Sequence, residues 1–211
     1  MTELNNLPFF TTNELVTSKN ILDTSVKQYA KRKIDDGSLL GLKKGMYVSR
    51  EYVSGLMPND LNLYKEFIAT VIKQPSYISL EYALGIYQIL PEMVASITCV
   101  TLSRPYSLNN YFGNYFYRSI KKDLFGGFEI KYFKNSNYYF ASKSKALFDH
   151  LYYKLPTIPV GKSTNLVEEL RLDLTSMKKE DWENLSFWSK KLGSDKFSNL
   201  VLNLKGNAYN N

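Results

Sequence analysis

The chain has 211 residues, of which 44% are hydrophobic, so it can bury a core as one large or two small domains, and a disordered polymer is excluded. Its formal net charge of +7 favours an anionic partner. One cysteine, Cys99, excludes an internal disulfide framework, and with one histidine, His150, the usual zinc ligand sets cannot be assembled, so we expect neither metal nor cofactor. No export signal and no apolar run of about twenty residues is present, so we expect a protein of the reducing cytoplasm without a membrane partner.

The N-terminal region predicts a short helix, a turn, a longer helix and a hairpin. Phe9 and Phe10 precede Thr11, an N-cap candidate for a helix that ends near residue 18. Residues 23–25 offer caps for a second helix over residues 25–36, which Gly37 stops. Short strands over residues 38–42 and 46–49 then flank a basic turn. This order of elements predicts a winged helix-turn-helix.

The rest of the chain changes from helical to strand periodicity and back, which predicts a larger α+β domain. Residues 55–58 form the expected boundary, with Pro58 opening a helix, so the predicted domains are residues 1–57 and 58–211. Helices are expected over residues 61–72, 80–87, 142–155, 166–174, 179–192 and 195–205. Strands, expected as an antiparallel sheet of hairpins, span residues 94–102, 106–112, 115–120, 128–133 and 138–141. Residues 206–211 predict a frayed tail.

Positive charge is concentrated in the N-terminal region. Between residues 19 and 50 eight basic residues stand against three acidic ones, so this window carries +5 of the whole +7. At about 100° per residue the second helix has one apolar and one polar face. The apolar face comprises Val26, Tyr29, Ala30 and Ile34. The polar face comprises Gln28, Lys31, Arg32 and Asp35.

The polar face carries the residue types that read duplex DNA. Glutamine pairs with adenine edges, arginine with guanine, and lysine with phosphate. Basic residues in the hairpin turn would reach adjacent phosphates or the minor groove. Helix, turn, helix and basic hairpin within one positive window together predict a DNA-binding domain. The predicted contact residues are Ser25, Lys27, Gln28, Lys31, Arg32, Lys43 and Lys44.

Several segments, in order along the chain, resemble the AbiEi family, the antitoxins of type IV toxin–antitoxin systems. They are residues 10–15 (FTTNEL), 42–47 (LKKGMY), 77–84 (YISLEYAL) with 90–92 (LPE), 97–101 (ITCVT) with Arg104, 112–120 (FGNYFYRSI) and 141–149 (ASKSKALFD). The resemblance implies a transcriptional repressor that binds inverted repeats upstream of its own operon. It also implies the antitoxin of an abortive-infection, phage-defence system, which opposes a nucleotidyltransferase-like toxin without a tight complex. None of these segments is a catalytic signature, so no enzyme activity is expected.

One alternative of a different class is a DNA-targeting nuclease with a winged-helix reader domain. Asp123 and the triplet Glu129-Ile130-Lys131 are the residue types with which some nucleases hold magnesium and position water. Glu and Lys two apart also share one face of an exposed strand, which needs no catalysis. Only six residues separate Asp123 from Glu129 and no second carboxylate is evident, so the repressor is favoured.

Other chemistry-bearing residues are interpreted as structural. His150 lies beside Asp149, yet no nucleophile is placed with it. Cys99 falls in an apolar strand and is expected in the core. Tyrosines between residues 106 and 153 follow strand spacing without interleaved arginines, which is typical of a sheet rather than an RNA platform. Residues 161–164 (GKST) lack the glycine of a phosphate-binding loop, which Pro156 replaces.

Overall fold

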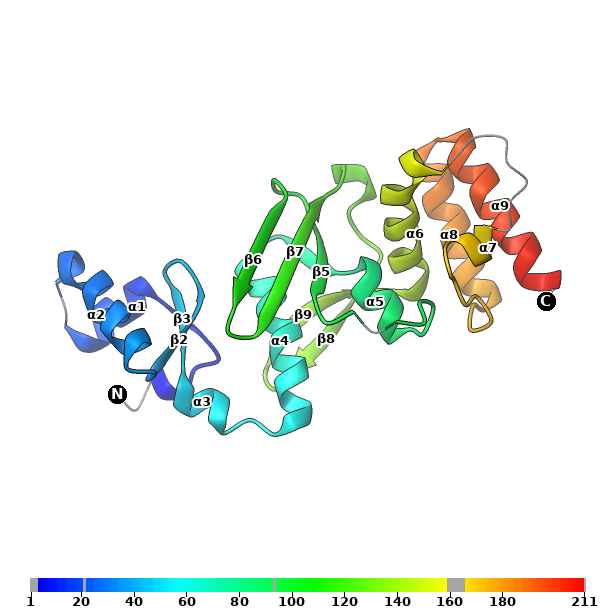
Figure 1. The fold of residues 1–211 in the computed structure, drawn as a ribbon. Helices are drawn as coiled ribbons and strands as arrows, with labels where there is room; N and C mark the ends of the chain where they lie inside the picture. The colour runs from blue at the N-terminus through cyan, green and yellow to red at the C-terminus, as the bar shows by residue number, and fades with distance from the viewer. Residues whose placement is uncertain (1–3, 21, 93, 159–165, 211) are drawn as a thin grey trace.

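The computed structural model describes residues 4–20, 22–92, 94–158 and 166–210, and shows a mixed α and β protein (Figure 1). The segment 161–164 therefore lies outside the described residues. A small unit of helices with a hairpin occupies one end, the large sheet lies in the middle, and the C-terminal helices lie at the other end (Figure 1). None of the described helices is long and apolar enough to cross a membrane.

The two helices and the hairpin predicted for the N-terminal region are present in the predicted order, as α1 (Thr12–Lys19), α2 (Asp23–Asp35), β2 (Leu39–Lys43) and β3 (Met46–Ser49). Three short elements were not predicted: η1 (Leu4–Asn6), β1 (Phe10–Thr11) and α3 (Arg50–Ser54). Thr11 caps α1 as predicted, in a capping box with Glu14. Strands β1, β3 and β2 pair antiparallel in that order. Gly45, in the turn between β2 and β3, has a φ of 77°, which glycine adopts without steric cost.

The second region holds one six-stranded sheet with helices around it. The elements are α4 (Pro58–Ile72), β4 (Ser76–Ile78), α5 (Leu80–Ile86), β5 (Ile97–Thr101), β6 (Tyr106–Asn110), β7 (Gly113–Ser119), η2 (Lys122–Leu124), β8 (Phe128–Phe133), β9 (Ser136–Ala141), α6 (Lys143–Lys154), η3 (Leu155–Thr157), α7 (Leu166–Glu169), α8 (Lys179–Leu192) and α9 (Asp195–Asn210). Pro58 opens α4, as the sequence predicts. The expected frayed tail is wrong, because α9 continues to Asn210.

The expectation of an antiparallel sheet in this region is also wrong, because the sheet is mixed. Its strand order is β6-β7-β5-β4-β9-β8, and the pairs β5 with β7 and β4 with β9 are parallel. The cause is topological: the β6–β7 hairpin places β7, not β6, beside β5, so that β5 and β7 run in the same direction. Strand β4 was not predicted, because its three residues are all buried and show no alternation.

Helices cover both faces of the sheet. Tyr117 of β7 donates its hydroxyl to the Ala69 carbonyl of α4, 2.7 Å away. The next residue, Arg118, has its guanidinium 5.2 Å from the ring centre of Tyr153 in α6. Because adjacent strand residues point to opposite faces, α4 and α6 lie on opposite sides of the sheet. Phe148 of α6 packs in turn against α8 and α9.

The hairpin β2–β3 lies between two hydrophobic clusters. One face contributes Leu39 to a small cluster with Phe10, Leu15, Val26 and Ala30. The other face belongs to the large core of the second region through Leu40, Leu42, Met46 and Val48. The division at residues 57 and 58 stays a prediction, and the hairpin before it shares a continuous core with the sheet after it.

Candidate nucleic-acid interface

The exposed face of α2 is the one that the sequence predicts. Val26 and Ala30 are 1% and 2% exposed, so they anchor the helix on the small cluster. Tyr29 is half-buried, and Ile34 departs from the pattern at 40% exposed because it lies near the end of the helix. The predicted contact residues on this helix are all exposed: Ser25, Lys27, Gln28, Lys31 and Arg32.

The polar side chains on this face have no partners within the described part of the chain. Lys27, Lys31 and Arg32 make no ion pair there, and the amide of Gln28 makes no hydrogen bond. Lys33 differs, because its Nζ lies 2.9 Å from Asp36 Oδ2, and this bond raises the pKa of Lys33. The helix therefore offers three uncommitted cations and one amide to a ligand.

No side chain of the described residues caps the N-terminus of α2. The sequence predicted side-chain caps from residues 23–25, but the N-cap is Leu22, whose apolar side chain makes no capping bond. Ser25 thus lies inside the first turn, with its backbone N–H bonded to the Leu22 carbonyl at 2.8 Å. The first N–H groups of a helix attract phosphate when no side chain satisfies them. Ser25 lies beside these first N–H groups of α2.

The two lysines of the hairpin turn lie in different environments. Lys44 is exposed beside Gly45. Lys43 is half-buried, and its Nζ donates a hydrogen bond of 2.5 Å to the Ile72 carbonyl at the end of α4. Burial lowers the pKa of Lys43, and the charge of Lys73 lowers it further. The ammonium of Lys43 is therefore occupied within the chain, whereas that of Lys44 is open to solvent.

The position of the hairpin is fixed by contacts that the sequence pattern does not contain. Asn110, at the end of β6, donates to the Leu42 carbonyl at 2.9 Å. Tyr64 of α4 donates its hydroxyl to the Pro8 carbonyl at 2.8 Å. Arg50 lies over the ring of Tyr111, 5.5 Å from its centre. These contacts hold the N-terminal unit in a defined orientation on the sheet.

No protein-family model matches this chain, and no curated protein matches it. The AbiEi resemblance therefore remains a hypothesis carried by the ordered segments of the sequence. The exposed polar face of α2 and the exposed Lys44 of the hairpin are observations that do not depend on this resemblance.

The residues of the nuclease alternative are not assembled into a metal site. Asp123 is exposed on η2 and Glu129 is exposed on the edge strand β8. Lys131 is turned onto Phe140, with its Nζ 3.5 Å from the ring centre. Across the described ranges, no group of three or more His, Cys, Asp and Glu side chains could hold a metal ion. No observation in this structure favours nuclease chemistry at these positions.

A buried polar network occupies the side of the sheet under α6. Lys145 and Asp149 are both fully buried, and their charged groups lie 2.5 Å apart. Asp149 also accepts hydrogen bonds from Tyr77 at 2.9 Å and Ser79 at 2.8 Å. Burial raises the pKa of Asp149 and lowers that of Lys145. The network is closed to solvent and satisfied, which indicates a structural role.

His150 and Cys99, which the sequence interpretation made structural, are both buried. His150 Nδ1 lies 3.4 Å from Glu81 Oε1. Burial alone would raise the pKa of Glu81, but the interaction with His150, a backbone hydrogen bond and the charge of Arg118 together outweigh it and lower that pKa to about 2. Burial raises the pKa of the Cys99 thiol, which keeps it protonated and unreactive.

Proposed function

We propose that the chain is a DNA-binding transcriptional repressor whose residues 1–57 act as a winged helix-turn-helix. The carrying observation is α2, which buries Val26 and Ala30 and presents an uncommitted polar face to solvent. In this proposal α2 enters the major groove and the β2–β3 turn reaches the flanking backbone. The packing of Leu39 in the hairpin with Val26 and Ala30 of α2 supports a fixed spacing between these two contacts.

The predicted contact residues of α2 read bases or bind phosphates in this proposal. Arg32 donates two hydrogen bonds to guanine O6 and N7, and Gln28 pairs with an adenine edge, each contact giving about 1–3 kcal/mol of discrimination. Lys27 and Lys31 bind phosphates and set the register. Ser25 lies in the first turn, where the helix N-terminus attracts a phosphate. Lys44 adds a phosphate contact from the hairpin turn.

The biological setting is proposed from the AbiEi resemblance. The repressor would act in the cytoplasm on inverted repeats upstream of its own operon. It would also serve as the antitoxin of a type IV system, opposing a nucleotidyltransferase-like toxin without a tight complex. Most residues of the large core lie in residues 58–211, which supports a separate role of this region in neutralisation.

A reporter fused to the DNA upstream of this chain's gene tests the proposal in cells. Repression by the full chain should be lost in the double variant Gln28→Ala, Arg32→Ala, because both base contacts are removed. The matched control is Lys190→Ala, an exposed residue of α8. If the gene neighbours a toxin gene, rescue from that toxin should persist in the α2 variant. Full repression by the α2 variant would contradict the proposal.

A further inference from the structure

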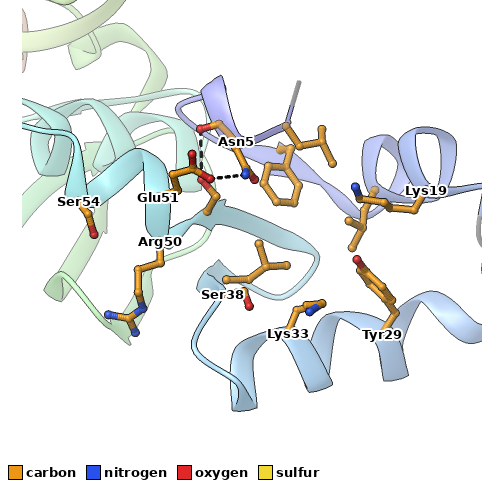
Figure 2. A pocket seen from close by; sticks show the side chains of 13 residues that line it. Asn5, Lys19, Tyr29, Lys33, Ser38, Arg50, Glu51 and Ser54 are labelled. Atoms are coloured by element: carbon orange, nitrogen blue, oxygen red, sulfur yellow. Dashed lines mark hydrogen bonds between the residues drawn. The ribbon is translucent and has the colours of Figure 1, made fainter. Parts of the chain in front are cut away.

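A pocket of 390 Å³ lies in the N-terminal unit, beside the proposed DNA-reading helix (Figure 2). Its walls come from η1, β1, α1, α2, β2, β3 and α3, so seven elements of the unit meet around it. The size is in the range of small-molecule sites, about 300–1,000 Å³. Four buried apolar side chains form part of the lining: Leu4, Phe10, Leu15 and Leu39.

The polar lining of the pocket is predominantly positive. Lys19, Lys33 and Arg50 contribute three cations, and the only carboxylate among the described lining residues is that of Glu51. That carboxylate already accepts a hydrogen bond of 2.5 Å from Asn5 (Figure 2). Because Lys33 is paired with Asp36 and Arg50 points away from the pocket, the attraction for an anionic ligand comes mainly from Lys19 (Figure 2).

Two polar groups at one end of the pocket are unpartnered. Lys19 of α1 and Tyr29 of α2 point toward each other at this end, whereas Arg50 points away (Figure 2). Within the described residues, neither the Lys19 ammonium nor the Tyr29 hydroxyl makes a hydrogen bond or ion pair, while Lys33 is bonded to Asp36. Lys19 and Tyr29 are both half-buried, so they face a cavity with only part of their hydration.

We propose that this pocket binds a small amphiphilic carboxylate. The apolar body of the ligand would lie on Phe10, Leu15 and Leu39. Its carboxylate would accept hydrogen bonds from the Lys19 ammonium and the Tyr29 hydroxyl. A charge-assisted bond of this kind contributes about 10- to 100-fold in affinity, so the acid is bound more tightly than a neutral molecule of the same shape.

The position of the pocket makes the ligand an effector of DNA binding, a step that rests on the proposed function. Lys19 belongs to α1 and Tyr29 to α2, so one carboxylate bridges the two helices. The bridge holds α2 in the orientation in which its polar face is exposed. Coupling between two sites is reciprocal and amounts to about 5–150-fold in affinity, so the bound acid should strengthen operator binding by at least about fivefold.

Calorimetric titration of the full chain tests the ligand site without DNA. The probes are octanoate and 2-naphthoate, with octan-1-ol as the uncharged control. We expect saturable binding of an acid, weakened about tenfold by Lys19→Met and less by Tyr29→Phe, with binding of octan-1-ol unchanged. Lys190→Met on α8 is the matched control and should bind like the native chain. Urea unfolding of each variant checks that the fold is intact.

Filling the pocket gives a second variant. Ser54 lies at the end of α3 and lines the pocket, so Ser54→Trp should weaken both the acid and the alcohol. Absence of saturable binding by both acids, or binding that Lys19→Met and Ser54→Trp leave unchanged, would overturn the site.

Fluorescence anisotropy with the upstream DNA duplex, with and without saturating acid, tests the effector role. Tighter DNA binding in the native chain and not in Lys19→Met supports it. Unchanged or weaker DNA binding at saturating acid would overturn it. Because the acid is titrated in the absence of DNA, failure of the DNA-binding proposal is seen separately, as a lack of binding to the duplex without acid.

Discussion

Reversing two charges on α2 is the perturbation with the largest expected effect on DNA binding. Three exposed cations are assigned to phosphates, Lys27, Lys31 and Lys44, whereas Arg32 is assigned to a base. At about −0.9 per neutralised phosphate, the slope of log affinity against log salt is about −2.7 for each bound chain. Without the phosphate contact of Lys31 the slope falls to about −1.8, so a fourfold rise in salt lowers affinity about 12-fold instead of about 40-fold. Loss of the base contact lowers the affinity itself by a further 10- to 100-fold, approximately.

The assay is fluorescence anisotropy of the upstream duplex, titrated with the Lys31→Glu, Arg32→Glu variant over a range of salt concentrations. The control variant reverses Lys190 and Lys191 on α8. Each Lys or Arg to Glu reversal lowers the net charge by two, so the formal net charge of both double variants falls from +7 to +3. Lys33→Glu should cost less binding, because Lys33 is already paired with Asp36. Equal loss in the α8 control, or a dominant effect of Lys33, would refute the assignment of the DNA-reading face.

Three further predictions follow from individual contacts. Lys44→Met should weaken DNA binding severalfold, as measured by anisotropy. Lys43→Met should leave DNA binding nearly unchanged but should lower the free energy of unfolding in urea by about 1 kcal/mol, because the bond of Lys43 to α4 is lost. Lys145→Met should destabilise the chain by about 3–5 kcal/mol in urea, because it leaves Asp149 without its buried counter-charge, and Asp149→Leu added to it should recover part of the loss. The pKa of Glu81 is about 2 in the folded chain against 4.5 ordinarily, so its contribution to stability is present above pH 4.5 and is lost as the pH falls toward 2. In Glu81→Gln the free energy of unfolding should therefore depend less on pH over this range. A pH profile identical to that of the native chain would contradict this role of Glu81.

Local patterns predict much of this fold. The strand Phe128–Phe133 and the helix Lys179–Leu192 have the bounds expected from their periodicity. The phase of α2 is correct as well, since Val26 and Ala30 are buried. Amphipathic periodicity and the Thr11 capping box are local properties that a single sequence carries, whereas the caps expected for α2 at residues 23–25 were wrong.

Long-range contacts account for the differences. Lys43 is turned toward Ile72, 29 residues away, and a register shift between Gly41 and Lys43 contributes to this orientation. Parallel pairing of β5 with β7 depends on how the chain crosses the sheet, which strand alternation does not encode. The pocket beside α2 requires seven elements to meet, so its residues could not be grouped from their spacing. Basic residues could be found from the sequence, but their partners could not.

Proximity cleavage of DNA from α2 tests the central claim most directly. Cys99 is the only cysteine and is fully buried, so an iron chelate can be attached selectively at Gln28→Cys. On the duplex from the upstream region, the chelate should cut at defined positions within the major groove. The same chelate at Lys190→Cys on α8 should leave the duplex uncut. Cleavage from residue 190 but not from residue 28, with duplex binding retained, would contradict the account.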